Sequence, residues 1–360
     1  MKKTVFTVAA VAIFSLLLLA GCGKLADSNK VEAFPTKNEK VKETVKMNEY
    51  NQFQDFFTPA FQLIWNDFSD KVIGHKVEFV DGNPKIVEEF NQKRLTDKML
   101  SEKDYYKTIA PQTYKTKKTI EKELKKKFNE KSQLLDRISW LKKDDKVHKV
   151  LYCMFKKDVY FPKVFEQLPP APFVAEQNSS TYYKMFGTMK NQSKFSQQVV
   201  PIYYKDKNDY AVRLLTKTGD EIILMTLNSD EPVLTIWDNL YSEKLSKNDS
   251  LHFDKNSKLL VPFIDFKKEI NYNELTGKPI VDSNIVIDTA LEVIEFSLDN
   301  TGAKIKNEAM MGIRTTALRP HEPQKLYYFN KPFVLFIRSK DGNVPYFAMK
   351  IKDTQYLKKG

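Results

Sequence analysis

Glycine and histidine are scarce in this 360-residue chain, and their scarcity limits what it can do. The 11 glycines argue against glycine-rich nucleotide-binding loops and flexible linkers. The four histidines are scattered, with no spacing typical of metal ligands: His75, His148, His252 and His321. The motifs His-Glu-x-x-His, Gly-x-Ser-x-Gly and Gly-x-x-x-x-Gly-Lys-Ser/Thr are all missing. We therefore expect neither an enzyme nor a cofactor.

Cysteine is rarer still, with only Cys22 and Cys153 in the chain. Cys153 stands in the apolar run 150–155, a setting typical of a small buried side chain rather than a nucleophile. Cys22 lies in an N-terminal leader segment, where we expect its thiol to be chemically modified. No intramolecular disulfide is therefore expected.

The first 22 residues have the pattern of a secretory signal. Lys2 and Lys3 precede a short apolar run over 8–19, which falls below the roughly 20 residues of a membrane span. The sequence Leu-Ala-Gly-Cys that ends at Cys22 is similar to the lipobox of bacterial lipoproteins. That resemblance implies cleavage before Cys22 and acylation of its thiol and amino group. It places the protein outside the cytoplasm, lipid-anchored to the bacterial cell membrane.

Positive charge dominates, with a net charge of +12. Removing residues 1–21 takes two lysines and no acid, which leaves +10. This balance favours anionic lipid headgroups or cell-wall polymers as partners. It would also attract nucleic acid, but an exported protein is separated from the cytoplasm, so no nucleic-acid partner is expected.

The chain divides into four parts by composition. Residues 1–21 form the signal peptide, 22–48 a charged flexible tether, 49–354 one domain and 355–360 a C-terminal tail. The domain begins near Tyr50, where apolar and aromatic residues become dense enough for a buried helix or two. With 42% hydrophobic residues, including 25 Phe and 17 Tyr, the domain can build a large core.

Residues 116–141 have the clearest helical periodicity. One face is apolar: Ile120, Leu124, Phe128, Leu134, Leu135, Ile138 and Leu141. The other face is basic: Lys115, Lys118, Lys122, Lys125, Lys126 and Lys127. Such a charge run is most often a solvated helix face, and the alternative is a docking site for an acidic surface.

Strand patterns dominate downstream. We expect strands over 147–155, 210–215, 221–227 and 259–266, and over 285–298 in two pieces. Thr218-Gly219-Asp220 predicts a hairpin turn between the second and third of these. Near the C-terminus, Phe333, Leu335 and Ile337 alternate with Val334 and Phe336, which predicts a strand buried on both faces. The turn Asp341-Gly342 then leads into a returning strand over 344–351.

The C-terminal hairpin carries a family resemblance. The order aromatic-x-Asn-Lys-Pro-Phe-Val-Leu-x-Ile over 328–337, followed by Phe-x-Met-x-Ile over 347–351, resembles the C-terminal signature of the serpin family. Further serpin-like landmarks follow the family's order: Phe57-Thr58-Pro59, 150–156, 184–187, 217–225 and 261–267. The resemblance covers 115–353 closely and 50–114 loosely. It implies an α+β, serpin-like fold with a large mixed sheet, a smaller barrel-like sheet and a reduced set of N-terminal helices.

The long segment from Asn300 to Tyr328 lies between two predicted strands. Connections of this length usually carry function, and the resemblance makes this one a reactive-centre loop, the bait for a protease. The family's hinge then falls on Gly302, Ala303, Ile305, Asn307 and Ala309. Ala303, Ile305, Asn307, Ala309 and Met311 share one face of a strand with period two. Ile305, Lys306, Asn307 and Met311 stand where serpins usually have small residues. Their bulk indicates slow insertion into the sheet or a strand already in place.

The family's spacing places the scissile bond between Arg314 and His321. The reactive-loop residues are Arg314, Thr315, Thr316, Ala317, Leu318 and Arg319. The two arginines suit trypsin-like enzymes, although Pro320 would hinder cleavage after Arg319. The alternative is a solvated loop that happens to contain arginines.

Two functions remain open. The first is protease inhibition by the loop, with a serine or cysteine protease as partner. The second is a non-inhibitory interaction or structural lipoprotein of the cell envelope that binds through its basic surface. The missing motifs disfavour a third class, an enzyme.

The leader gives the first prediction. Cys22→Ala removes the acylated thiol, and two acyl chains stabilise anchoring by about 0.8 kcal/mol per buried methylene. We expect the variant to be released from membranes or left unprocessed in cell fractionation. Membrane retention at the processed size would contradict a lipid anchor at Cys22.

Overall fold

The structure is a computed structural model that describes residues 54–143, 147–174, 181–190, 192–245, 251–305 and 325–360. The predicted signal peptide, the tether and Cys22 lie outside the described residues. So do Asn307, Ala309 and the reactive-loop residues Arg314–Arg319, together with His321.

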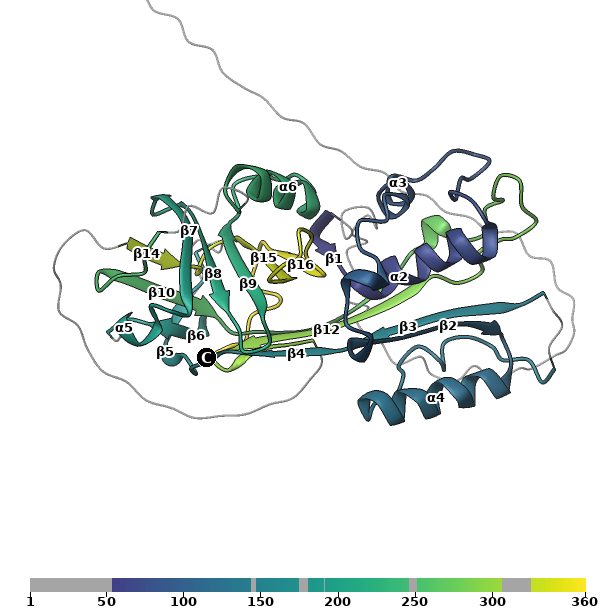
Figure 1. The fold of residues 1–360 in the computed structure, drawn as a ribbon, viewed down its shortest axis with the longest axis horizontal. Coiled ribbons are helices and arrows are strands. Elements are labelled where there is room, and N and C mark those ends of the chain that lie inside the picture. The colour runs from purple at the N-terminus through teal and green to yellow at the C-terminus, as the bar shows by residue number, and fades with distance from the viewer. Residues whose placement is uncertain (1–53, 144–146, 175–180, 191, 246–250, 306–324) are drawn as a thin grey trace, which may run out of the picture. The chain divides into compact units, whose positions relative to one another are not determined.

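The largest sheet has six antiparallel strands in the order β1-β16-β15-β9-β8-β7 (Figure 1). Their bounds are Phe56–Phe57, Phe347–Ile351, Phe333–Ser339, Asp220–Thr226, Asp209–Leu215 and Val199–Asp206. From Phe333 to Arg338 every residue of β15 is buried, because the strand has neighbours on both edges and core on both faces. Its pairing runs from Phe333 with Ile351 to Ile337 with Phe347. The predicted buried hairpin is therefore confirmed.

A second sheet has four strands in the order β14-β10-β6-β5. Their bounds are Lys325–Tyr328, Ser257–Pro262, Tyr182–Thr188 and Glu166–Pro172. The β14 and β10 strands are parallel and the other pairs antiparallel. The chain end packs here as well, since the Gly360 amide donates to the Tyr182 carbonyl at 2.9 Å.

The remaining strands form an elongated layer. One sheet has the order β11-β12-β13-β4, with bounds Ile264–Asn271, Leu291–Asp299, Gly302–Ile305 and Lys157–Tyr160. A two-stranded sheet pairs β2 (Tyr105–Pro111) with β3 (Lys149–Phe155), and only Lys156 separates β3 from β4 along the chain.

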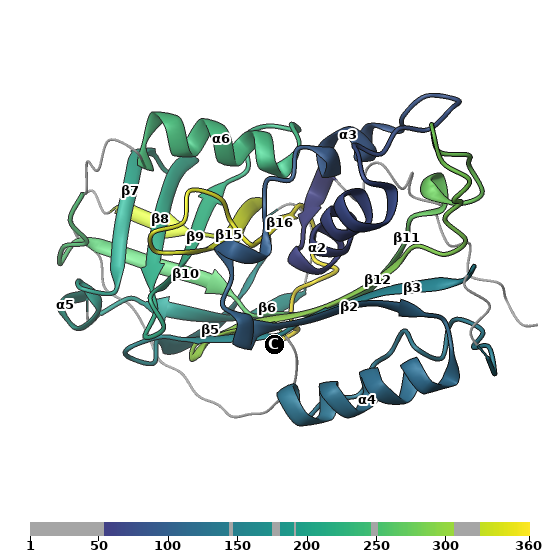
Figure 2. The ribbon, with the colours of Figure 1, turned by 45° about the vertical axis from the view of Figure 1, so that its right-hand side comes forward.

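Helices are few in the described part of the chain. They are α2 (Pro59–Asp67), α3 (Lys85–Asn91), α4 (Tyr114–Phe128), α5 (Gln192–Phe195) and α6 (Val233–Glu243), with a π-helical turn over Phe68–Ile73 and short 3₁₀ turns. The elongated layer lies between α2 on one face and α4 on the other (Figure 2). The predicted α+β class with a large sheet and few N-terminal helices is confirmed. None of the described helices is long and apolar enough to cross a membrane.

Three sequence predictions need correction. The helix expected over 116–141 ends at Phe128, because Asn129 adopts a left-handed conformation with φ of 57° and breaks the helical path. The strand expected over 259–266 is two strands, β10 and β11, which belong to different sheets. Of the two pieces expected over 285–298, only β12 forms.

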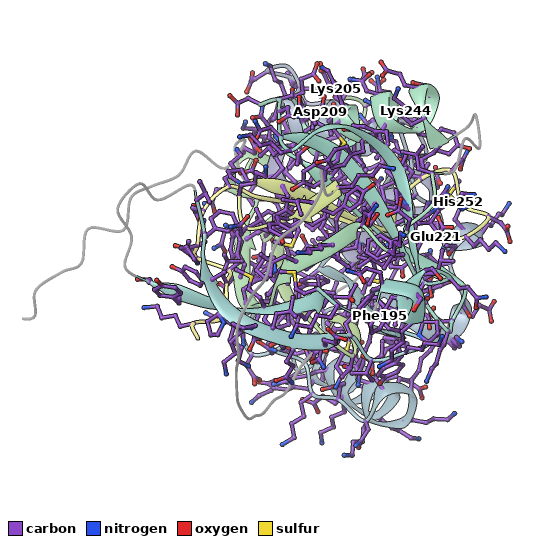
Figure 3. The ribbon with its side chains drawn as sticks, turned by 90° about the vertical axis from the view of Figure 1, so that its left-hand side faces the viewer. Phe195, Lys205, Asp209, Glu221, Lys244 and His252 are labelled. Atoms are coloured by element: carbon purple, nitrogen blue, oxygen red, sulfur yellow. The ribbon has the colours of Figure 1, made fainter. Side chains whose placement is uncertain are left out.

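Glu221 of β9, labelled in Figure 3, forms buried ion pairs with the two neighbouring strands of the largest sheet. Arg338, its register partner on β15, approaches its carboxylate at 2.7 Å, and Arg213 on β8 lies 3.4 Å from the other oxygen. Arg338 also lies over the ring of Trp237, at 5.8 Å from the centroid, which connects α6 to the sheet. The charges are therefore paired where the core excludes water.

Phe333→Ala tests the core of the sheet. The ring is 0% exposed, and its loss leaves a cavity as well as removing transfer free energy, so unfolding should become easier by about 3–5 kcal/mol. Denaturant unfolding measures this, with Val286→Ala at a 46% exposed position as the control. An unchanged midpoint in Phe333→Ala would show that the ring does not support the core.

Candidate functional site

The strand β13 is only four residues long, yet it lies in the middle of its sheet. It pairs antiparallel with β12 through Lys304 and Ser297, Ala303 and Leu298, and Gly302 and Asp299. Its other edge pairs antiparallel with β4, from Gly302 with Tyr160 to Ile305 with Lys157. The chain after Asp299 therefore turns back into its own sheet and separates β12 from β4.

Gly302 makes this insertion possible. Its φ of +150° is rare for residues with a side chain, and a Cβ built on it would lie 2.1 Å from the Val159 carbonyl oxygen. The preceding turn is anchored as well. Thr301 donates to Asp299 Oδ1 from its amide at 2.7 Å and from its hydroxyl at 2.6 Å. The Phe165 amide donates to the Asn300 carbonyl at 2.9 Å. The turn and the strand start are thus both fixed.

Beyond Ile305, the last residue of β13, no described strand lies between β3 and β12. β3 pairs along one edge with β2, and β12 from Leu291 to Phe296 pairs along one edge with β11. No ladder joins β3 to β12 within the described residues, although β3 continues the line of β4. We call this pair of unpaired edges the slot. Strand edges of this kind present backbone donors and acceptors that a further strand can use.

A polar cavity of about 350 Å³ lies beside the junction of β3 and β4, and no described residue of β12 or β13 lines it. Its lining comes from four parts of the chain: Ser101, Lys103, Asp104, Lys127, Phe128, Lys156, Lys157, Asp158, Thr218 and Asp220. Lys157, the register partner of Ile305, pairs with Asp220 at 2.8 Å and with Asp104 at 3.3 Å. The buried Oδ1 of Asp158 has no hydrogen-bond partner among the described residues. The cavity is therefore a polar feature of the β3–β4 junction.

Glu292 lies on β12, which forms one edge of the slot, and is buried. Its carboxylate accepts hydrogen bonds from the Thr58 hydroxyl at 2.6 Å and the Tyr272 hydroxyl at 2.8 Å. It also accepts from the Phe61 amide, so it caps the N-terminus of α2, where Thr58 is the N-cap residue. Burial raises the pKa of this carboxyl, although these hydrogen bonds oppose the shift. Glu292 thus joins α2 to one wall of the slot.

The segment that follows α4 reaches from one wall of the slot to the other. It leads into β3, and its Gln133 amide donates to Glu295 on β12. Arg137 pairs with Glu269 on β11 at 2.7 Å. Lys156, at the junction of β3 and β4, pairs with Glu130 at 2.9 Å. These contacts link the two walls across the slot.

The structure describes only part of the predicted hinge. Gly302 and Ala303 lie buried in β13, and Ile305 is its last residue. Asn307 and Ala309 lie outside the described residues, as do all six predicted reactive-loop residues and Cys22. Sequence reasoning missed Glu292, although it occupies the inward phase of an alternating strand with Ile294, Phe296 and Leu298. An acidic residue in this otherwise apolar, inward-facing series could have indicated a buried, hydrogen-bonded carboxylate.

Neither nucleophilic nor metal chemistry is visible in the described residues. Cys153 is half-buried, and desolvation raises the pKa of its thiol, which keeps the thiol protonated. Within the described ranges no group of three or more His, Cys, Asp and Glu side chains is placed to hold a metal.

Comparisons with known proteins give structural similarity only. No family model matches the chain, and no curated protein matches it. Among solved structures, the chain is similar to Serpin48 of the insect Tenebrio molitor, with 12% identity, a TM-score of 0.45, and coverage of 82% of this chain and 90% of that one. It is similar to the thermophilic serpin tengpin in its native state, with 14% identity, a TM-score of 0.41, and coverage of 90% and 97%. Human thyroxine-binding globulin in complex with its ligand has 11% identity, a TM-score of 0.40, and coverage of 70% and 76%. Identities this low carry none of those proteins' activities over to this chain.

Glu292→Gln tests the cap of α2 through its pH dependence. Because the folded state raises the carboxyl pKa, the contribution of Glu292 to stability is full below its unfolded-state pKa and is lost as pH rises through the folded-state pKa. Glutamine does not ionise, so the variant should gain stability relative to the parent from pH 4.5 to 8, by about 1.4 kcal/mol per unit of raised pKa. Denaturant unfolding across this range measures the difference. A difference that stays constant with pH would contradict a buried, titrating Glu292.

Proposed function

We propose that this protein is a lipid-anchored, serpin-type protease inhibitor of the bacterial cell surface. The observation that carries the proposal is the slot beyond β13, formed by the unpaired edges of β3 and β12. The sequence resemblance supports it by assigning the segment after β13 to a reactive-centre loop. The partner is a serine or cysteine protease, and the anchor is the acylated Cys22.

The register of β13 indicates how the loop would enter the slot. Continued beyond Ile305, its pairing with β4 would run onto β3, with Asn307 opposite Phe155 and Ile313 opposite Lys149. Its pairing with β12 would set Asn307 opposite Ile294 and Ala309 opposite Glu292. Residues 306–310 would thus have a strand on both sides. Each backbone hydrogen bond gained would contribute on the order of 1 kcal/mol net.

The burial pattern of β13 and β12 supports the same register, because it indicates which residues of the inserted segment would face the core. Ala303 is fully buried and Lys304 is half-buried, while Glu292, Ile294, Phe296 and Leu298 are the buried residues of β12. Alternation then directs Asn307 and Ala309 toward the α2 side of the layer. Asn307 would carry a polar amide into that face, so insertion should be slow and its net gain modest.

Inhibition would use the chemistry of the protease itself. Its serine hydroxyl or cysteine thiol attacks a carbonyl between Arg314 and His321, and the peptide bond breaks. The new amino terminus leaves with a proton, and an ester or thioester joins the protease to the upstream segment. Insertion of that segment would then carry the acylated protease away from the loop site and distort it.

A non-inhibitory binding lipoprotein is the second candidate, and specific residues favour it. Lys306 and Asn307 are larger than the residues that allow fast insertion. The contacts of Gln133 and Arg137 also link the two walls of the slot, and full insertion would have to accommodate them. In this candidate the seated β13 is a fixed part of the sheet.

Cleavage followed by melting separates the two candidates. A protease cut within Arg314–His321, confirmed by mass spectrometry, should raise the melting temperature modestly if residues 306–310 enter the slot. Ala309→Asp should abolish the rise, because it would bring a second carboxyl beside Glu292. Glu308→Asp, on the opposite face, should keep the rise. The protease itself should form an SDS-stable complex with the parent chain.

Two results would count against inhibition. One is a cleaved protein that melts no higher than the intact one. The other is an equal rise in Ala309→Asp and Glu308→Asp, which would show that the gain does not come from strand insertion in this register.

A further inference from the structure

The outer surface of α4 is exposed along its length. Ile120 and Leu124 are 0% exposed, and they pack with Val150 and Tyr152 of β3 in a small core of their own. The helix lies along β2 and β3 with its opposite side facing away from the rest of the protein (Figure 2). No described ion pair or side-chain hydrogen bond joins the side chains of that side to another element.

Four exposed lysines form this outward side, which we call the lysine ridge. They are Lys115, Lys118, Lys122 and Lys126. Their spacing of three, four and four residues places them in one row, about 16 Å long at 1.5 Å per residue. Glu121 and Glu123 lie on the flanks of the helix instead. None of the four lysines has an ion pair among the described residues, so their charges are free to meet an external anion.

Helix stability does not explain the ridge. Neighbouring like charges at i,i+4, as in Lys118 with Lys122 and Lys122 with Lys126, are destabilising. The first turn contains Lys115 and Lys117 and no acid, which opposes the helix macrodipole. Only the last-turn lysines, Lys125–Lys127, are placed where the dipole favours a cation. The helix holds seven lysines against two glutamates in 15 residues, a concentration that its own folding does not require.

The shape of the ridge fits an extended anionic surface rather than a small anion. The α4 residues that line the polar cavity are Lys127 and Phe128, and no ridge lysine contributes to it. Tyr114, 51% exposed, lies at the N-terminal end of the same helix and supplies an aromatic ring of the kind enriched at membrane interfaces. Each exposed lysine near an anionic membrane surface contributes about 1 kcal/mol of attraction, a factor of about five in affinity, so a row of four fits a lipid headgroup layer.

We propose that the lysine ridge docks the domain on anionic phospholipid headgroups, with the axis of α4 parallel to the membrane plane. The contact is electrostatic and independent of the acyl group at Cys22, so it would orient the domain rather than anchor it. It weakens as ionic strength rises, because the lysines are exposed to screening. The slot then has a fixed relation to the membrane.

Vesicle co-sedimentation tests the proposal. The processed chain starting at residue 22 carries Cys22→Ser, so no acyl group is attached. It is mixed with phosphatidylcholine vesicles containing 30% or no phosphatidylglycerol at about 0.1 M salt. We expect binding to the anionic vesicles alone. Each ridge lysine changed to glutamine should weaken it about fivefold, and all four together by at least a hundredfold.

A control variant of equal charge isolates the ridge from net charge. Lys76, Lys98, Lys255 and Lys340 are exposed and lie on other elements, and their change to glutamine should leave binding nearly unchanged. Thermal melts show that both variants fold. Equal loss of binding in the two variants, or no binding by the parent chain, overturns the proposal. So does ridge-dependent binding to soluble polyphosphate without binding to vesicles.

Discussion

The close approach of Gly302 to the backbone of β4 is the constraint on which the candidate site depends. A side chain there would collide with the Val159 carbonyl, so only glycine allows the chain to turn after Asp299 and enter between β12 and β4. Once seated, β13 keeps these strands two strand spacings apart. The slot and the register available to a further strand both follow from that separation.

Two buried charged groups lie along β4 and β12. Lys157 of β4 is held between Asp104 and Asp220. Glu292 of β12 caps α2 with its carboxylate. Because that carboxylate is buried and its pKa is raised, it connects the helix and the slot wall through a contact that depends on pH. Charged groups in the core around β15 are paired: Glu221 with Arg338 and Arg213, and Lys350 of β16 with Asp55.

Local sequence patterns predicted much of the fold. The run from Phe333 to Ile337 is apolar on both faces, and a strand with that property has few places to lie except inside a sheet. The turn at Gly219, with φ of 79°, follows from a residue type that tolerates positive φ. The end of α4 was missed because apolar periodicity continues to Leu141, whereas a single left-handed residue, Asn129, stops the helix.

The sequence alone did not predict which strands and side chains far apart in the chain come together. That the hinge could be a strand was visible in its period of two, but its position was left open between slow insertion and a strand already in place. The structure places residues 302–305 in the sheet because Gly302 meets Tyr160, a partner 142 residues earlier. Glu292 was missed for the same reason, since its role depends on Thr58 and Tyr272, which reach it only in the folded chain.

The central claim is that the edges of β3 and β12 below β13 are open to a strand supplied by the chain itself. Amide hydrogen exchange on these two strands, before and after a cut within Arg314–His321, tests it most directly. The account predicts that alternate amides of 149–155 and 291–296, those that point into the slot, exchange freely in the intact protein and become protected after the cut. Exchange that is already protected before the cut, or unchanged by it, would contradict an open slot that the loop can fill.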